Sequence, residues 1–129
     1  MNIVHAVIVV PGNPVALARA RTGKRAWYTP KPSLDYQQQI GLAWKATGKG
    51  ALKDGQVFVT VEAVFARPAK PAHEWPSRPD IDNLLKNVLD ALTKVGAIDD
   101  DRRVVSAQTE KRYVLPGGAP YLRIVIRKE

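Results

Sequence analysis

Apolar residues alternate with polar ones, or gather into β-branched runs, in four stretches of this chain, and both patterns are typical of β-strands. The stretches are 3–10, 56–65, 103–115 and 121–127. In the second stretch, for example, Val57 and Val59 fall on the same side of an extended chain. A Pro-Gly-Gly turn at 116–118 separates the last two stretches. We therefore expect four strands.

Two further stretches repeat apolar residues at helical spacing. In the clearer one, 81–95, leucines and valines form a single stripe, and Gly96 follows where a C-terminal cap belongs. The other helix is expected to begin at Ser33, a good N-cap residue, and to end before Gly48. The resulting order βαβαββ predicts an α/β two-layer sandwich, with two helices on one face of a mixed four-stranded sheet. At this length we expect a single domain, 1–129.

Charge and composition narrow the function. The chain has 20 Lys and Arg against 12 Asp and Glu, a formal net charge of +8, so its surface should attract a polyanion, nucleic acid first. It has no cysteine, which excludes disulfides and thiolate metal sites and fits a reducing cytoplasm. No stretch resembles a signal peptide or approaches the roughly 20 apolar residues that span a bilayer. We therefore expect a cytoplasmic protein without a membrane partner.

The acidic residues are concentrated, because half of them lie between Asp80 and Asp101. Asp80 and Asp82 stand two apart at the start of the second helix. If Asp80 is the N-cap, with extended backbone, the two carboxylates can converge. The triplet 99–101 follows about one helix later, and a shared cation would relieve its repulsion. Carboxylates suit a hard divalent cation, so together with a basic surface they indicate metal-dependent cleavage of a phosphodiester.

A structural explanation of the same acids stays open. Aspartates in a first helical turn complement the helix dipole, and Asp82, Lys86 and Asp90 are spaced for surface ion pairs. The acidic triplet would then be a solvated loop tip. On this interpretation the protein is a non-catalytic DNA-binding or architectural protein. A less specific phage nuclease for branched DNA is a further alternative.

At this point three sequence blocks resemble a known family, the RusA family of Holliday junction endodeoxyribonucleases. The blocks are RPDIDNLLK at 78–86, LDALTKVG at 89–96 and DD at 100–101. The N-terminal part is similar to the family's opening as well, with Gly12, Pro14, Arg19, Arg21 and Tyr28. The resemblance covers nearly the whole chain, and its specific part is the block from Asp80 to Asp101.

The resemblance implies a site and a partner. It implies that Asp80, Asp82 and Asp101 bind the catalytic Mg²⁺, with Mn²⁺ as a possible substitute, and that Lys86 serves the reaction. It also implies a homodimer that cuts four-way DNA junctions by paired nicks, in recombination and repair. Because the acids form a triplet here, either Asp100 or Asp101 could face the metal.

Chain geometry limits how such a site can form. The helix 81–95 should be about 22 Å long at 1.5 Å per residue. The six steps from Val95 to Asp101 reach at most about 20 Å. We expect the chain to run back beside the helix, so that Asp101 meets Asp80 within one subunit. The alternative is that Asp101 completes a site in the partner subunit.

Basic residues flank the proposed site in two segments, and we expect them to contact DNA phosphates. They are Arg19, Arg21, Lys24 and Arg25 in the first segment, and Arg67, Lys70 and Arg78 in the second. Trp27 and Tyr28 either stack on unstacked bases or fold into the core. Trp44 and Trp75 are expected to be packing residues. His73 is a weaker candidate for a DNA contact.

Overall fold

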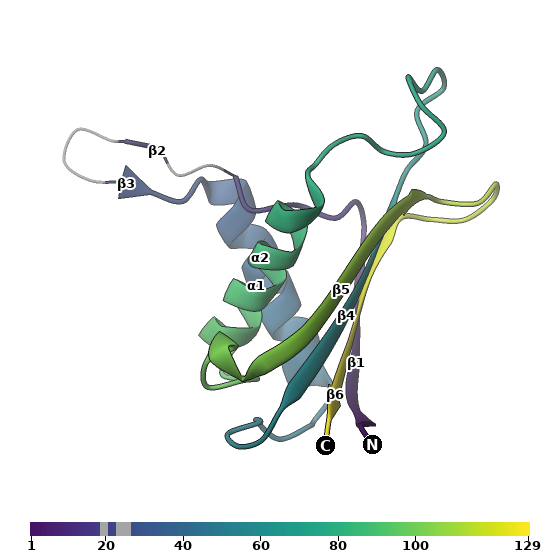
Figure 1. The fold of residues 1–129 in the computed structure, drawn as a ribbon. Helices are drawn as coiled ribbons and strands as arrows, with labels where there is room; N and C mark the ends of the chain where they lie inside the picture. The colour runs from purple at the N-terminus through teal and green to yellow at the C-terminus, as the bar shows by residue number, and fades with distance from the viewer. Residues whose placement is uncertain (19–20, 23–26) are drawn as a thin grey trace.

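The computed structural model describes residues 1–18, 21–22 and 27–129. Its elements, labelled in Figure 1, are β1 (Ile3–Pro11), β2 (Arg21–Thr22), β3 (Trp27–Tyr28), α1 (Lys31–Ala46), β4 (Val57–Phe65), α2 (Ile81–Val95), the 3₁₀-helix η1 (Asp101–Arg103), β5 (Val104–Tyr113) and β6 (Tyr121–Lys128). Strands β2 and β3 pair with each other as a short ribbon. The other strands form one four-stranded sheet.

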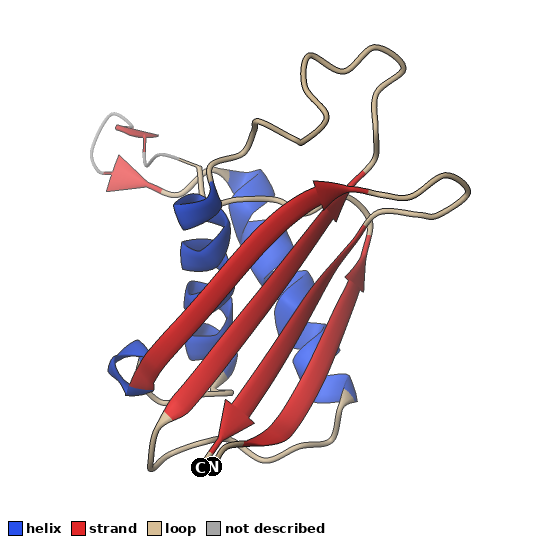
Figure 2. Cartoon of the chain, turned by 45° about the vertical axis from the view of Figure 1, so that its right-hand side comes forward, coloured by secondary structure: helices blue, strands red, loops and turns tan. Residues whose placement is uncertain are grey.

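The main sheet is mixed. Its strand order is β1-β6-β4-β5, with β6 antiparallel to both of its neighbours and β5 parallel to β4. Figure 2 shows the sheet as one layer and both helices together on one of its faces. The predicted α/β two-layer sandwich and its order βαβαββ are therefore confirmed.

The core lies between the sheet and the helices. Alternate residues of β4, such as Val57, Val59 and Val61, are buried against the helices, as their period of two predicts. Helix α2 supplies its apolar stripe to the same core, with Leu84 and Leu92 fully buried. Burial of each such side chain contributes about 1.5–3 kcal/mol. No helix in the described part of the chain is long and apolar enough to cross a bilayer.

Buried polar contacts fix the segment after β1 against the helices. Gln37 of α1 donates to the Asn87 side-chain oxygen of α2 (2.8 Å), and the Asn87 amide donates to the Val15 carbonyl (2.8 Å). The Leu17 N–H adds a bond to the Asn83 carbonyl (2.9 Å). Unpaired, these buried groups would each destabilise the fold by about 1–3 kcal/mol. Residues 15–17 are thus held beside the start of α2.

The structure differs from the sequence prediction at the start of α1. The helix begins at Lys31, with Pro30 as N-cap and Pro32 in the first turn. Proline is tolerated there because the first helical N–H groups have no partner within the helix. Ser33 is not the N-cap: it is buried, and its hydroxyl donates to the Ala16 carbonyl (3.0 Å). The prediction placed the helix start two residues too late for this reason.

The end of α2 follows the prediction. Gly96 adopts the left-handed conformation (φ 83°) and caps the helix. The chain is then held at this end of α2, because the Leu52 N–H bonds to the Ala97 carbonyl (2.8 Å) and the Asp99 N–H bonds to the Leu52 carbonyl (3.3 Å). This attachment decides where the acidic triplet lies.

Candidate active site

The site is built where β4 and β5 end. These strands are parallel, so their carboxyl ends meet at one edge of the sheet, where α/β proteins commonly bind ligands. The loop 66–80 leads from the end of β4 to the start of α2. Lys111, near the end of β5, donates to the carbonyls of Pro79 (2.9 Å) and Ser77 (3.1 Å) and ties this loop to the sheet. The start of α2 is therefore held at this edge.

The first two candidate aspartates lie at the start of α2. Asp80 is the N-cap and has extended backbone (φ −65°, ψ 144°), as the sequence predicted. Its side chain makes no capping hydrogen bond, and Asp82 accepts only from the adjacent Asn83 N–H (2.9 Å). Within the described residues, neither carboxylate takes part in a salt bridge. Both are exposed, so most of their oxygen lone pairs are free for a ligand.

Lys86 lies one turn further along α2 and is exposed. The part of the chain that the structure describes contains no salt bridge between Lys86 and either Asp82 or Asp90. The row of surface ion pairs that the structural explanation requires is therefore not formed. The ammonium group of Lys86 is available for a phosphate.

The members of the acidic triplet differ from one another. Asp99 accepts from Arg103 (Nη2 to Oδ2, 3.0 Å), and Asp100 accepts from both the backbone N–H (2.8 Å) and Nε (3.0 Å) of Arg102. These contacts hold the pKa of each of the two carboxyls below its usual value. Asp101 is exposed and, among the residues described, has no salt bridge. The pattern favours Asp101 over Asp100 as the free ligand.

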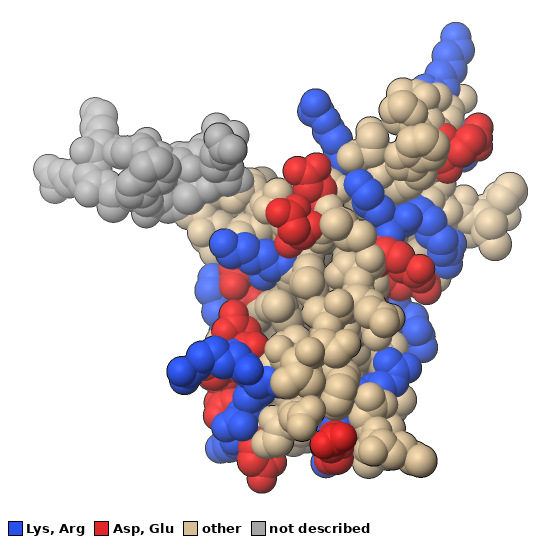
Figure 3. Space-filling model, viewed as in Figure 1, with Lys and Arg blue, Asp and Glu red and all other residues tan. Residues whose placement is uncertain are grey.

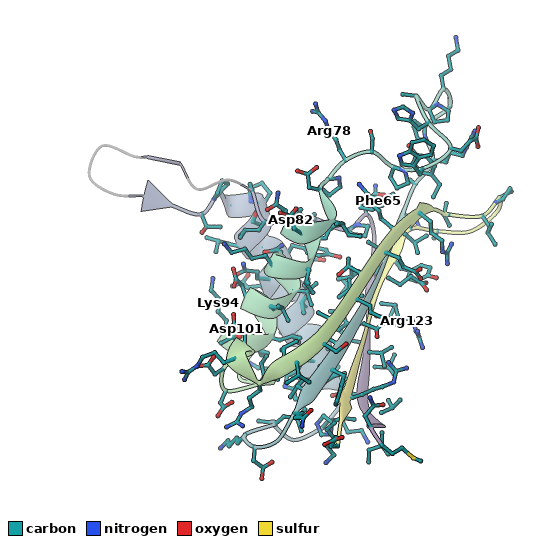
Figure 4. All side chains as sticks on the ribbon, in the orientation of Figure 1. Phe65, Arg78, Asp82, Lys94, Asp101 and Arg123 are labelled. Carbon is teal, nitrogen blue, oxygen red and sulfur yellow. The ribbon has the colours of Figure 1, made fainter. Side chains whose placement is uncertain are left out.

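Asp101 does not meet Asp80 and Asp82 within one subunit. Figure 4 shows Asp82 at one end of α2 and Asp101 at the other, beside Lys94. Across residues 1–18, 21–22 and 27–129, no group of three or more His, Cys, Asp or Glu side chains could hold a metal ion. The expectation of a return within one chain is wrong. The chain does run back, but as β5, which starts only after the Leu52 contacts have fixed the triplet at the far end.

Cationic side chains surround the Asp80–Asp82 end. Arg67, Lys70 and Arg78 are exposed on the loop 66–80, as expected for phosphate contacts. Figure 3 shows the acidic spot at the start of α2 with Lys and Arg side chains on both sides of it, and Figure 4 shows Arg78 projecting from the loop just before the helix. The side chains of the first basic segment are not available for comparison: Arg19, Lys24 and Arg25 lie outside the described residues, and Arg21 is described only as backbone of β2.

Trp75 is a candidate that sequence reasoning missed. Trp44 is buried as predicted (5% exposed), but Trp75 is 56% exposed and stacks on His73, with ring centroids 4.7 Å apart. The packing prediction for Trp75 is therefore wrong. The signal for a different role was its position in a loop rich in prolines and cations, which offers no apolar neighbours to cover an indole. An exposed aromatic pair among cations can stack on a nucleobase.

Comparison with known proteins gives one result. Residues 11–127 match the family model described as Endodeoxyribonuclease RusA. No curated protein matches the chain closely enough to serve as a relative. The matched range includes the start of α2, the acidic triplet and all four strands of the main sheet. The chain belongs to the RusA family of endodeoxyribonucleases.

Proposed function

We propose that this chain is a cytoplasmic, Mg²⁺-dependent endonuclease that resolves Holliday junctions by paired nicks, in DNA recombination and repair. Family membership supports DNA cleavage at branched junctions. The observation that carries the proposal is the pair Asp80 and Asp82, whose exposed carboxylates lack ion-pair partners among the described residues and lie at the carboxyl edge of the sheet, one turn from an equally free Lys86.

The residues fit a hard divalent cation. Mg²⁺ and Mn²⁺ prefer oxygen ligands, and Mg²⁺ is commonly held by one or two carboxylates together with substrate phosphate and water. Asp80 and Asp82 supply such carboxylates, and Asp101 would be a third. When bound, the cation supplies charge neutralisation at the scissile phosphate and makes its bound water more acidic.

Each neighbouring side chain has a defined task in this proposal. Lys86 places a positive charge beside the phosphate, where negative charge grows during the attack. Arg67, Lys70 and Arg78 attract and orient the DNA backbone. Trp75 stacks on a base that is unpaired at the crossover. These tasks divide chemistry, on α2, from substrate positioning, on the loop 66–80.

The test is a cleavage assay on a labelled four-way junction. The purified protein is incubated with Mg²⁺, with Mn²⁺ or with a chelator, and a linear duplex of the same sequence serves as the control substrate. We expect paired nicks in the junction with either metal and none with the chelator or in the duplex. Junction binding without cleavage under every metal condition would instead support the non-catalytic DNA-binding alternative.

A further inference from the structure

Strand β5 is an outer strand of the main sheet and has little protection against a further strand. Proteins commonly protect such edges with charges, prolines or bulges. The run VVSAQT at 104–109 contains no charge and no proline, and Ser106, Ala107 and Gln108 are exposed. After a register shift at the start of β4, pairing with β4 is continuous from Ser106 to Tyr113. The middle of β5 therefore offers a regular, uncharged edge.

The two ends of β5 carry opposite charges. Asp99 and Asp100 are paired with arginines of their own segment, so Asp101 provides surplus negative charge just before the strand. Lys111 lies near the other end and bonds to the Pro79 carbonyl, next to Asp80. The cationic end of β5 is thus the end that carries Asp80 and Asp82, and the acidic end carries Asp101.

We propose that β5 pairs antiparallel with β5 of a second copy and that the partner's Asp101 thereby completes the Asp80–Asp82 site. This inference rests on the proposed function. Antiparallel pairing reverses one copy, so it brings the acidic end of one β5 to the cationic end of the other. A register centred on Ser106 or Ala107 places Asp101 opposite the partner's Lys111 or the partner's Tyr113, about 4.8 Å away across the strands.

The same arrangement accounts for paired nicking. A two-fold axis at the centre of β5 makes the interface isologous and generates two equivalent sites per dimer. Each site takes Asp80 and Asp82 from one copy and Asp101 from the other. Neither copy then holds a complete set of three carboxylates alone, in keeping with the placement of Asp82 and Asp101 in Figure 4.

The opposite edge, β1, is the competing surface and serves as the control. It is also uncharged, and Val7 and Val9 are exposed. However, its pairing has an irregularity between Val4 and Ala6, and it ends at Pro11, which has no N–H to donate. Pairing through β1 would leave Asp101 far from both copies of Asp82. Charge complementarity and site completion therefore favour β5.

The first test uses disulfide cross-linking, which is clean because the chain has no cysteine. Residues beside the two-fold axis of an antiparallel pair lie about 4.5–5.5 Å from their own copies, within disulfide range. We expect Ser106→Cys or Ala107→Cys to form a covalent dimer on mild oxidation, without DNA, and Val7→Cys to stay uncross-linked. A monomer by light scattering, or cross-linking at Val7→Cys alone, would overturn the inference.

The second test asks whether the sites are shared. Differently tagged Asp82→Asn and Asp101→Asn chains are co-expressed, the mixed dimer is purified, and a supercoiled plasmid with a cruciform is the substrate. In a shared arrangement one of the two sites is intact, so we expect nicked circles where each parent variant gives none. The matched control, a mixed dimer of Asp80→Asn and Asp82→Asn, has no intact site and should stay inactive.

The outcomes separate the two proposals. If the wild-type protein cleaves with metal but the mixed dimer does not, the shared site is overturned and the proposed function stands. If the wild-type protein cleaves under no metal condition, the proposed function is overturned and the shared catalytic site with it. Recovery of nicking in the mixed dimer, together with the Ser106→Cys or Ala107→Cys cross-link, would establish both the interface and its consequence.

Discussion

The two ends of α2 both carry aspartates, and the structure treats them differently. At the C-terminal end, Asp99 and Asp100 are bonded to Arg103 and Arg102. At the N-terminal end, Asp80 and Asp82 have cations nearby in sequence but no salt bridge within the described residues. The difference teaches that acidic residues alone do not define a site. Carboxylates whose hydrogen-bonding capacity is unused are the ones available to a ligand.

The largest expected effect is at the N-terminal end. Asp82→Asn keeps the side-chain shape and removes the charge that would hold a cation, so junction cleavage should fall by at least roughly 10²–10³. Binding should be retained or tightened, because repulsion from phosphates falls. Single-turnover cleavage and a gel-shift titration measure the two effects. Asp90→Asn, two turns further along the same helix, is the matched control; near-normal cleavage by Asp82→Asn would remove the site assignment.

The second prediction compares neighbours within the triplet. Asp101→Asn should abolish cleavage as Asp82→Asn does, whereas Asp99→Asn and Asp100→Asn should change it by only a few fold, because exposed ion pairs contribute about 0–1 kcal/mol. The same single-turnover assay ranks the three variants. Equal losses at Asp100 and Asp101 would mean that the metal site uses the triplet as a whole, and the contrast between the two ends of α2 would weaken.

Lys86 tests whether the free cation on α2 acts on the reaction. Lys86→Ala should lower the cleavage rate by roughly 10²–10³ while binding changes little, since one transition-state contact is lost. Lys94→Ala, at the last turn of the same helix, is the control for general loss of charge. If rate and affinity fall by the same small factor, Lys86 is only a surface cation.

The smallest effect concerns substrate positioning by the loop 66–80. Trp75→Ala should weaken junction binding by about 1–3 kcal/mol, the contribution of one base–aromatic stack, and should affect the linear duplex less. Competition binding with both substrates gives the ratio. Trp75→Phe should restore most of the selectivity. Equal weakening for junction and duplex would mean that the indole contacts backbone rather than an unstacked base.

The fold could be predicted from the sequence where the signal is local. The alternation of valines in β4 and the apolar stripe of α2, ended by Gly96, depend only on neighbours within each element. The extended N-cap Asp80 followed from the same local logic. The start of α1 could not be predicted, because burying the Ser33 hydroxyl under Ala16 requires tertiary contacts.

The placement of Asp101 depended on contacts between distant residues. Chain length allowed a return to Asp80, but Leu52 bonds to Ala97 and Asp99 and fixes the triplet at the far end of α2. Nothing in the spacing of 95–101 signals a partner some 45 residues earlier. The exposure of Trp75 was missed for a related reason, since its burial depended on where a long loop would lie.

The position of β6 has a consequence for how the chain is made. This strand is the last in sequence, yet it lies inside the sheet, between β1 and β4. Until residues 121–128 leave the ribosome, β1 has no partner strand and one side of β4 is open, so the nascent chain exposes apolar strand edges. Completion of the sheet must wait for the end of synthesis. Truncation before β6 should therefore give aggregated protein rather than a smaller folded one.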